Sequence, residues 1–161
     1  MKFKPSNCKG ITLAELVIAV VIMGIASALA VPVFGRVMYK LKLNAATRDI
    51  TSDLRWARSQ SISKRVQYGL NFDFANKTYR VFYDKDNPAG FLYNAAADSV
   101  VKVGDLSTIG TSSSTFANNT VIFKPDGSCN TSGTITCYST NSSNSKTVGV
   151  LASTGRIKVN S

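Results

Sequence analysis

The sequence predicts an α+β chain, in which one long N-terminal helix packs on an antiparallel β-sheet head domain. Three changes of pattern along the chain support this prediction. An apolar run covers residues 11–33, and an amphipathic segment covers residues 34–65. From residue 66 to residue 161, short β-branched and aromatic runs alternate with turn residues, which is typical of strands.

The apolar run is long enough to cross a membrane as a helix. Among residues 11–33, only Thr12, Glu15 and Ser27 carry polar side chains. At about 1.5 Å per residue the helix would be about 34 Å long, against a hydrocarbon core of about 30 Å. We therefore expect a transmembrane helix over residues 11–33. Glu15 needs an explanation, because a charge near the centre of such a helix costs roughly 2.5–3.5 kcal/mol.

Two ordinary kinds of N-terminal segment, a secretory signal and a single-pass membrane anchor, explain residues 11–33 only in part. A secretory signal could use Ala28-Leu29-Ala30 as its cleavage site, but its apolar region would be unusually long and would contain an acid. A plain single-pass anchor fits the length and leaves Glu15 unexplained. The flanking charge does not decide the orientation, because basic residues lie on both sides of the run: Lys2, Lys4 and Lys9 before it, and Arg36, Lys40 and Lys42 after it.

Residues 34–65 have the spacing of a helix that packs one face on a sheet. The charged residues 48, 49, 53, 55 and 58 lie mostly off the apolar stripe, and Trp56 is expected to pack in the domain. Pro32 removes one helical hydrogen bond, so it predicts a kink without ending the helix. The sequence thus predicts one helix from about Ile11 to Lys64. Its core-facing stripe is expected to consist of Phe34, Val37, Leu41, Ala45, Ile50, Leu54 and Ala57.

The head domain, residues 66–161, is predicted to be antiparallel. Residues 66–74 and 78–84 flank a short turn and predict a hairpin. Polar segments at 107–119 and 138–145 are predicted to be loops, because they hold few apolar groups. Further strands are expected in 100–104, 120–127, 146–153 and 154–159.

The composition argues against catalysis. The chain has no histidine, which removes the commonest general base and the commonest metal ligand. No spacing suggests a nucleophile with its base, a phosphate-binding loop or a metal cluster. We therefore predict no enzyme, no metal and no cofactor. The formal net charge of +10 suits an anionic partner, or solubility alone.

Two of the three cysteines lie close together in the head domain. Cys129 and Cys137 flank a short polar segment, whereas Cys8 precedes the apolar run. If the head is exported, the pair is predicted to form a disulfide, with free thiols as the alternative. Closing such a short loop would stabilise the fold by roughly 2–3 kcal/mol.

Lys9-Gly10, followed by residues 11–16, resembles the prepilin signal of type IV pilins and type II secretion pseudopilins. The resemblance implies that residues 1–10 form a leader and that a membrane peptidase cuts between Gly10 and Ile11. The same enzyme would methylate the new amine of Ile11. Many pilins have Phe at this position, and Pro32 stands where many have a helix-kinking proline.

This resemblance gives Glu15 a partner. Cleavage would leave a cationic amine on Ile11, and Glu15 of one subunit would neutralise the amine of a neighbouring subunit as the helices stack into a filament. A buried charge pair is tolerated where a single buried charge is not. The resemblance also implies an inner-membrane precursor with its head in the periplasm, which then enters a pilus or pseudopilus with other pilins or pseudopilins.

The head resembles minor pilins of the GspH/FimT type, and the implied fold is pilin-like. The matching runs are Ala57-Arg58-Ser59, the Pro-Asp-Gly turn that ends at Gly127, and Gly155-Arg156-Ile157-Lys158. The implied function is that of a structural minor pilin or pseudopilin of a type II secretion pseudopilus or a type IV pilus, with no small-molecule substrate. The alternative is a DNA-binding minor pilin for natural transformation, in which Arg156 and Lys158 would contact phosphates.

Overall fold

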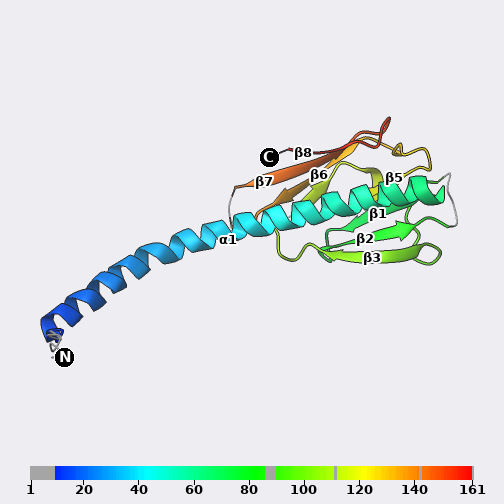
Figure 1. The fold of residues 1–161 in the computed structure, drawn as a ribbon. Coiled ribbons are helices and arrows are strands. Elements are labelled where there is room, and N and C mark those ends of the chain that lie inside the picture. The colour runs from blue at the N-terminus through cyan, green and yellow to red at the C-terminus, as the bar shows by residue number, and fades with distance from the viewer. Residues whose placement is uncertain (1–9, 86–89, 111, 142, 161) are drawn as a thin grey trace, which may run out of the picture. The chain divides into compact units, whose positions relative to one another are not determined.

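The structure is a computed structural model that describes residues 10–85, 90–110, 112–141 and 143–160, without the side chains of residues 29–33. The chain divides into two compact units, Met1–Val37 and Met38–Ser161, which are described separately below (Figure 1). The predicted leader and Cys8 lie outside the described residues, except for Gly10. The predicted kink at Pro32 and the end of the predicted span involve side chains outside the described set.

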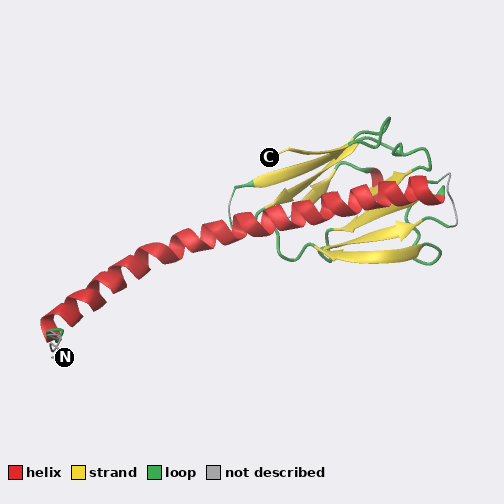
Figure 2. Ribbon diagram, viewed as in Figure 1, coloured by secondary structure: helices red, strands yellow, loops and turns green. Residues whose placement is uncertain are grey.

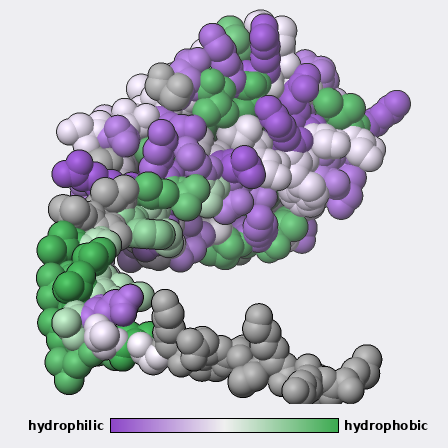
Figure 3. Space-filling model, turned by 60° about the vertical axis from the view of Figure 1, so that its left-hand side comes forward, coloured by the Kyte–Doolittle hydropathy of each residue, from purple (hydrophilic) through white to green (hydrophobic). Residues whose placement is uncertain are grey.

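Helix α1 extends from Leu13 to Lys64, as the sequence predicts, and belongs to both units. In the first unit the large apolar side chains that are described are exposed, from 82% at Leu13 to 50% at Val17, and Figure 3 shows the apolar surface that they form on one face. An apolar helix of this kind needs lipid or other helices to cover it. In the part of the chain whose side chains are described, no helical stretch is both long enough and apolar enough to cross a membrane.

The head contains two four-stranded antiparallel sheets (Figure 2). The first sheet has the order β3-β2-β1-β5 and the second has the order β4-β6-β7-β8. A 3-10 turn, η1 (Ala117–Asn119), precedes β5. The strand bounds are β1 Tyr68–Asp73, β2 Thr78–Tyr83, β3 Ser99–Asp105, β4 Ser112–Ser114, β5 Thr120–Phe123, β6 Gly133–Tyr138, β7 Ser145–Val150 and β8 Ile157–Asn160.

Six of these strands fall where the sequence predicts them, and two do not. The predicted hairpin is confirmed, with β1 paired to β2 from Tyr68↔Tyr83 to Asp73↔Thr78. Strand β4 lies inside the segment predicted to be a loop, because its three serines carry no hydrophobic signal. Strand β6, which contains Cys137, is not predicted by the sequence pattern, although Ile135 and Cys137 alternate there with half-exposed threonines.

The core-facing stripe of α1 differs from the prediction. Ile50, Leu54 and Ala57 are fully buried as expected, but Phe34, Val37, Leu41 and Ala45 are exposed. Leu43 and Ala46 are buried in their place, together with Thr47 and Thr51. The Thr47 hydroxyl donates to the Leu43 carbonyl at 2.7 Å, and this bond lets a polar residue occupy the core face. Trp56 remains 38% exposed and meets the Tyr68 ring edge-on, with 5.8 Å between ring centroids.

Asp53 is a buried acid that the sequence pattern placed off the core stripe. Its carboxylate accepts hydrogen bonds from the Tyr79 hydroxyl at 2.6 Å and from the Lys102 ammonium at 2.7 Å. Tyr79 lies on β2 and Lys102 on β3, so the carboxylate ties α1 to two strands of the first sheet. Both partners satisfy a charge that would otherwise be costly to bury.

The predicted disulfide is wrong for this structure, in which Cys129 and Cys137 are buried free thiols. Cys129 pairs with Phe123 at the end of β5, whereas Cys137 lies on β6 opposite Ser112 and Lys146. Cys129 is thus bridged to the end of the first sheet and Cys137 lies within the second sheet, and each packs in the core cluster. Burial raises the pKa of Cys129 and raises that of Cys137 to about 11, so both thiols stay protonated at neutral pH.

Candidate functional site

The predicted cleavage position lies in an open segment just before α1. Gly10 and Ile11 are exposed, Ile11 at 76%. A Cβ built on Gly10 would meet no described atom within 4 Å. A peptidase needs access to the bond that it cuts. The geometry at Gly10 and Ile11 therefore suits the processing that the sequence predicts.

Thr12 caps the N-terminus of α1 and fixes the place of Glu15. The Glu15 backbone N–H donates to Thr12 Oγ1 at 3.2 Å, and the Leu16 N–H donates to the Thr12 carbonyl at 3.2 Å. Thr-x-x-Glu is the sequence signature of a capping box, a signal that the sequence analysis missed. Glu15 consequently lies in the first helical turn, where the helix dipole favours a negative charge.

The Glu15 carboxylate has no cationic partner among the residues that the structure describes. Its neighbours along the helix are exposed apolar side chains, such as Leu16 and Ile18. The other polar group of this stretch is satisfied within the helix, because Ser27 Oγ donates to the Met23 carbonyl at 2.8 Å. Glu15 is therefore the charged group of this apolar surface that a partner would have to neutralise.

The C-terminal motif leads into β8, which lies at the edge of the second sheet. Arg156 and Lys158 are exposed, and Ile157 between them is half-buried against the core. Among the strands that the structure describes, β8 pairs with β7 alone, so its other side is an open edge.

The glycine of this motif has a structural role. Arg58 on α1 donates from Nε to the Gly127 carbonyl at 3.0 Å and from Nη2 to the Thr154 carbonyl at 2.9 Å. Gly155 is buried with a φ of 59°, and a Cβ there would collide with the Gly127 carbonyl oxygen. The Arg58 run, the turn at Gly127 and the terminal motif thus form one interlocked cluster.

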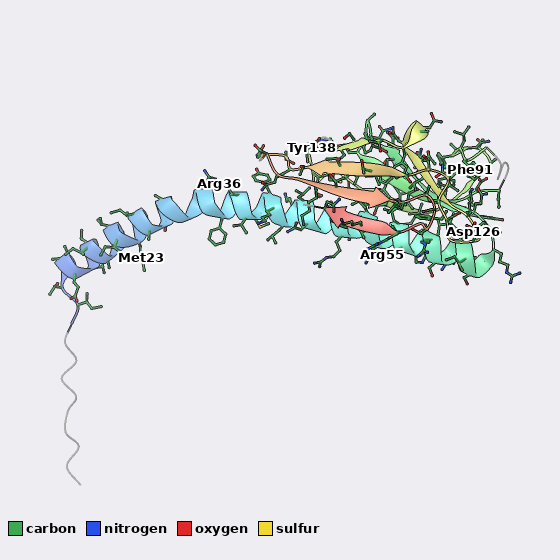
Figure 4. All side chains as sticks on the ribbon, turned by 90° about the horizontal axis from the view of Figure 1, so that it is seen from above. Met23, Arg36, Arg55, Phe91, Asp126 and Tyr138 are labelled. Carbon is green, nitrogen blue, oxygen red and sulfur yellow. The ribbon has the colours of Figure 1, made fainter. Side chains whose placement is uncertain are left out.

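A groove runs between α1 and the end of the chain near β8. It has two stretches of about 550 and 650 Å³, which share Arg55. Figure 4 shows Arg55 projecting from α1 beside β8. Arg48, Arg55 and Lys146 line the first stretch, and Arg55, Arg58 and Arg156 line the second. The described lining includes no acid, so the groove is basic along its length.

Among the described residues, no group of three or more His, Cys, Asp or Glu side chains could hold a metal ion. The sequence pattern shows the groove arginines of α1 only as charges off the core stripe. Their spacing of seven residues, Arg48 to Arg55, is the signal that they share one helix face.

Comparison with known families matches the N-terminal segment and most of the head domain. Residues 46–155 match the family described as type II transport protein GspH, and residues 5–31 match the prokaryotic N-terminal methylation motif. The second match includes Gly10, Ile11 and Glu15. A search of curated proteins gave no match.

Solved structures share the fold at low sequence identity. The type IV minor pilin FimU of Pseudomonas aeruginosa is 16% identical, with a TM-score of 0.60 over 76% of this chain and 90% of that chain. The minor pseudopilin EpsH from the type 2 secretion system of Vibrio cholerae is 8% identical, with a TM-score of 0.60 over 74% of this chain and 97% of that chain. The predicted pilin-like α+β fold is therefore confirmed.

Pilins and pseudopilins are structural subunits that assemble with one another and are not enzymes. Their N-terminal signal directs processing by a prepilin peptidase and membrane-anchored assembly into a pilus. Since the family match covers residues 46–155, the chain belongs to the GspH family and is a minor pilin or pseudopilin.

Proposed function

We propose that the chain is made as an inner-membrane precursor, cut between Gly10 and Ile11, and methylated on Ile11. Residues 11–33 hold it in the membrane with the head domain in the periplasm. The processed chain then enters a type II secretion pseudopilus or a type IV pilus through packing of its apolar helix. This proposal rests on the methylation motif and on the open geometry around Gly10.

The observation that carries the assembly step is the position of Glu15. It lies in the first turn of an exposed apolar helix, capped by Thr12, without a described cationic partner. Removal of residues 1–10 leaves Thr12 in place, so the cap and the orientation of Glu15 survive processing. The new amine of Ile11 on a neighbouring subunit is a cation of matching chemistry at the same end of the helix.

Processing is tested by co-expressing the full chain with its prepilin peptidase and measuring its intact mass. We expect a mature chain that begins at Ile11 and carries one added methyl group. Gly10→Leu should keep the leader, because a large side chain at this position obstructs the peptidase. A wild-type chain that keeps residues 1–10, or is cut elsewhere, contradicts the proposal.

DNA binding through Arg156 and Lys158 is a second candidate function. It is supported by the exposure of both cations on an open sheet edge. Contacts to successive phosphates would be independent of sequence and would weaken with salt. Titration of duplex DNA against the full chain in detergent micelles, at several salt concentrations, tests this candidate. Salt-sensitive binding that disappears in Arg156→Ala/Lys158→Ala supports it, and binding unchanged in that variant excludes it.

A further inference from the structure

Within the described part of the chain, the open edge of β8 presents main-chain groups without a main-chain partner, beside the basic groove. Leu151 N–H donates to the Arg156 carbonyl at 3.0 Å, which fixes residues 151 and 156 as a hydrogen-bonded pair. Backbone groups alternate in direction along an antiparallel strand, so residues 158 and 160 also point toward β7. The N–H and C=O groups of Ile157 and Val159 therefore point away from β7, toward the open edge.

The same two residues line the groove. Ile157 lies in its second stretch and Val159 in its first, and Val159 is 40% exposed. The wall opposite is the α1 face that carries Arg48, Ser52 and Arg55, which are exposed and spaced by four and three residues. The groove thus combines the short open edge of β8 with the exposed side chain of Val159. Opposite them, Arg48 and Arg55 lie about 10 Å apart along the helix axis.

These features select an occupant. A row of outward main-chain donors and acceptors is matched by another extended strand, which adds to the sheet by β-augmentation. Arg48 and Arg55 are matched by carboxylates, which accept charge-assisted hydrogen bonds from guanidinium groups. Nucleic acid would use the arginines but would leave the Ile157 and Val159 main-chain groups without partners. The observations therefore favour a polypeptide over DNA.

We propose that the groove between α1 and β8 takes an extended acidic segment of a partner protein, which adds to β8 as a fifth strand of the second sheet. Its carboxylates meet Arg48 and Arg55, and Lys146 also lines the groove. Arg58 does not take part, because its guanidinium is already bound to Gly127 and Thr154. The inference goes beyond assembly through the N-terminal helix and does not depend on cleavage at Gly10.

The test uses the full chain in nonionic detergent micelles and a fluorescein-labelled peptide, Thr-Glu-Val-Glu-Val-Glu-Thr, read by fluorescence anisotropy. We expect binding, and we expect Arg48→Gln/Arg55→Gln to weaken it by about tenfold or more, since both changes remove charge pairs. The matched control, Lys77→Gln/Lys85→Gln, removes two exposed cations outside the groove and should leave binding unchanged.

Strand addition is tested separately from charge. Two forms of the same peptide are N-methylated at alternate residues, each on one of its two edges. Both keep their carboxylates, and each loses the N–H donors of one edge. The form methylated on the edge that pairs with β8 should not bind. Val159→Pro removes an outward donor without removing a bond to β7, and should also weaken binding. Equal binding by both alternately methylated peptides, or no peptide binding, overturns the proposal. Duplex DNA binding that needs Arg48 and Arg55, without peptide binding, also overturns it in favour of a nucleic-acid groove.

Discussion

Arg58 and Gly127 are joined by a hydrogen bond of 3.0 Å from the guanidinium Nε to the main-chain carbonyl. A second bond from the same guanidinium reaches Thr154 at 2.9 Å. Arg58 lies on α1, Gly127 follows β5 of the first sheet, and Thr154 lies between β7 and β8 of the second. One side chain therefore fixes two turns, one from each sheet, against the helix.

Replacing Arg58 by Lys should destabilise the head domain. A lysine ammonium cannot reproduce two bonds in the fixed directions of a guanidinium, so at least one carbonyl loses its partner. We expect a loss of about 1–2 kcal/mol in the free energy of unfolding, measured by urea denaturation. Arg55→Lys, a turn away on the same helix and exposed, is the control and should change stability little. Equal stability of both variants would contradict the role of Arg58.

Gly155→Ala should be strongly destabilising. Its φ of 59° disfavours any residue with a side chain, and the new Cβ would collide with the Gly127 carbonyl oxygen. We expect a loss of about 1–3 kcal/mol or more in thermal or urea unfolding. Gly149→Ala is the matched control, because a Cβ there meets its nearest atom at an ordinary 3.8 Å. If Gly155→Ala were no worse than the control, the interlocked turns would not be rigid.

Replacing Asp53 should destabilise the head domain, although the sequence pattern places this acid among the charged residues off the core stripe. Asp53→Ala leaves the buried Tyr79 hydroxyl without its acceptor and removes the partner of Lys102. We expect a loss of about 1–3 kcal/mol in the free energy of unfolding. Asp49→Ala, four residues earlier on the exposed side, should have little effect. Comparable losses in both variants would show that the buried contact adds nothing.

The fold should lose stability in alkali. Burial, with the Asp53 hydrogen bond, raises the pKa of Tyr79 above its ordinary value of 10, so the folded chain keeps a proton that the unfolded chain releases. This contribution is present below about pH 10 and is lost as pH rises above it, at roughly 1.4 kcal/mol per pH unit. Cys137, with its pKa raised to about 11 from 9, adds a loss between those values. Urea unfolding from pH 8 to pH 11 should show the decline, and Tyr79→Phe should make it shallower. An equal slope in both proteins would contradict this origin.

The sequence predicted the long helix, the hairpin and the terminal strands because their hydrophobic periods are strong and local. Strand β4 was not predictable from its three serines, since only pairing with β6 makes it a strand. The predicted core stripe of α1 is wrong between residues 34 and 45. Thr47 and Thr51 lie on the buried face of the helix, because each hydroxyl bonds back to a helix carbonyl and so tolerates burial. Hydrophobic spacing alone gives no sign of that.

The candidate site was predictable where a local motif specifies it and not where the fold assembles it. Gly10, Ile11 and Glu15 lie within one short run of sequence, which matches the N-terminal methylation motif over residues 5–31. The groove is different, because Arg48 and Arg55 meet Val159 only after more than a hundred residues of chain have folded. The disulfide prediction failed for a similar reason, since nearness in sequence did not place Cys129 and Cys137 in the same sheet.

The most direct test of the account is incorporation of Glu15→Ala into filaments. Cells that carry the cognate peptidase and assembly machinery express the variant, and the protein is quantified in the sheared filament fraction and in membranes. The account predicts a chain that is cut at Ile11 and methylated, remains in the membrane and is nearly absent from filaments. Ser27→Ala, which changes another exposed polar residue of the same helix, should incorporate normally. Glu15→Ala in filaments at the wild-type level would contradict the pairing of Glu15 with a neighbouring amine.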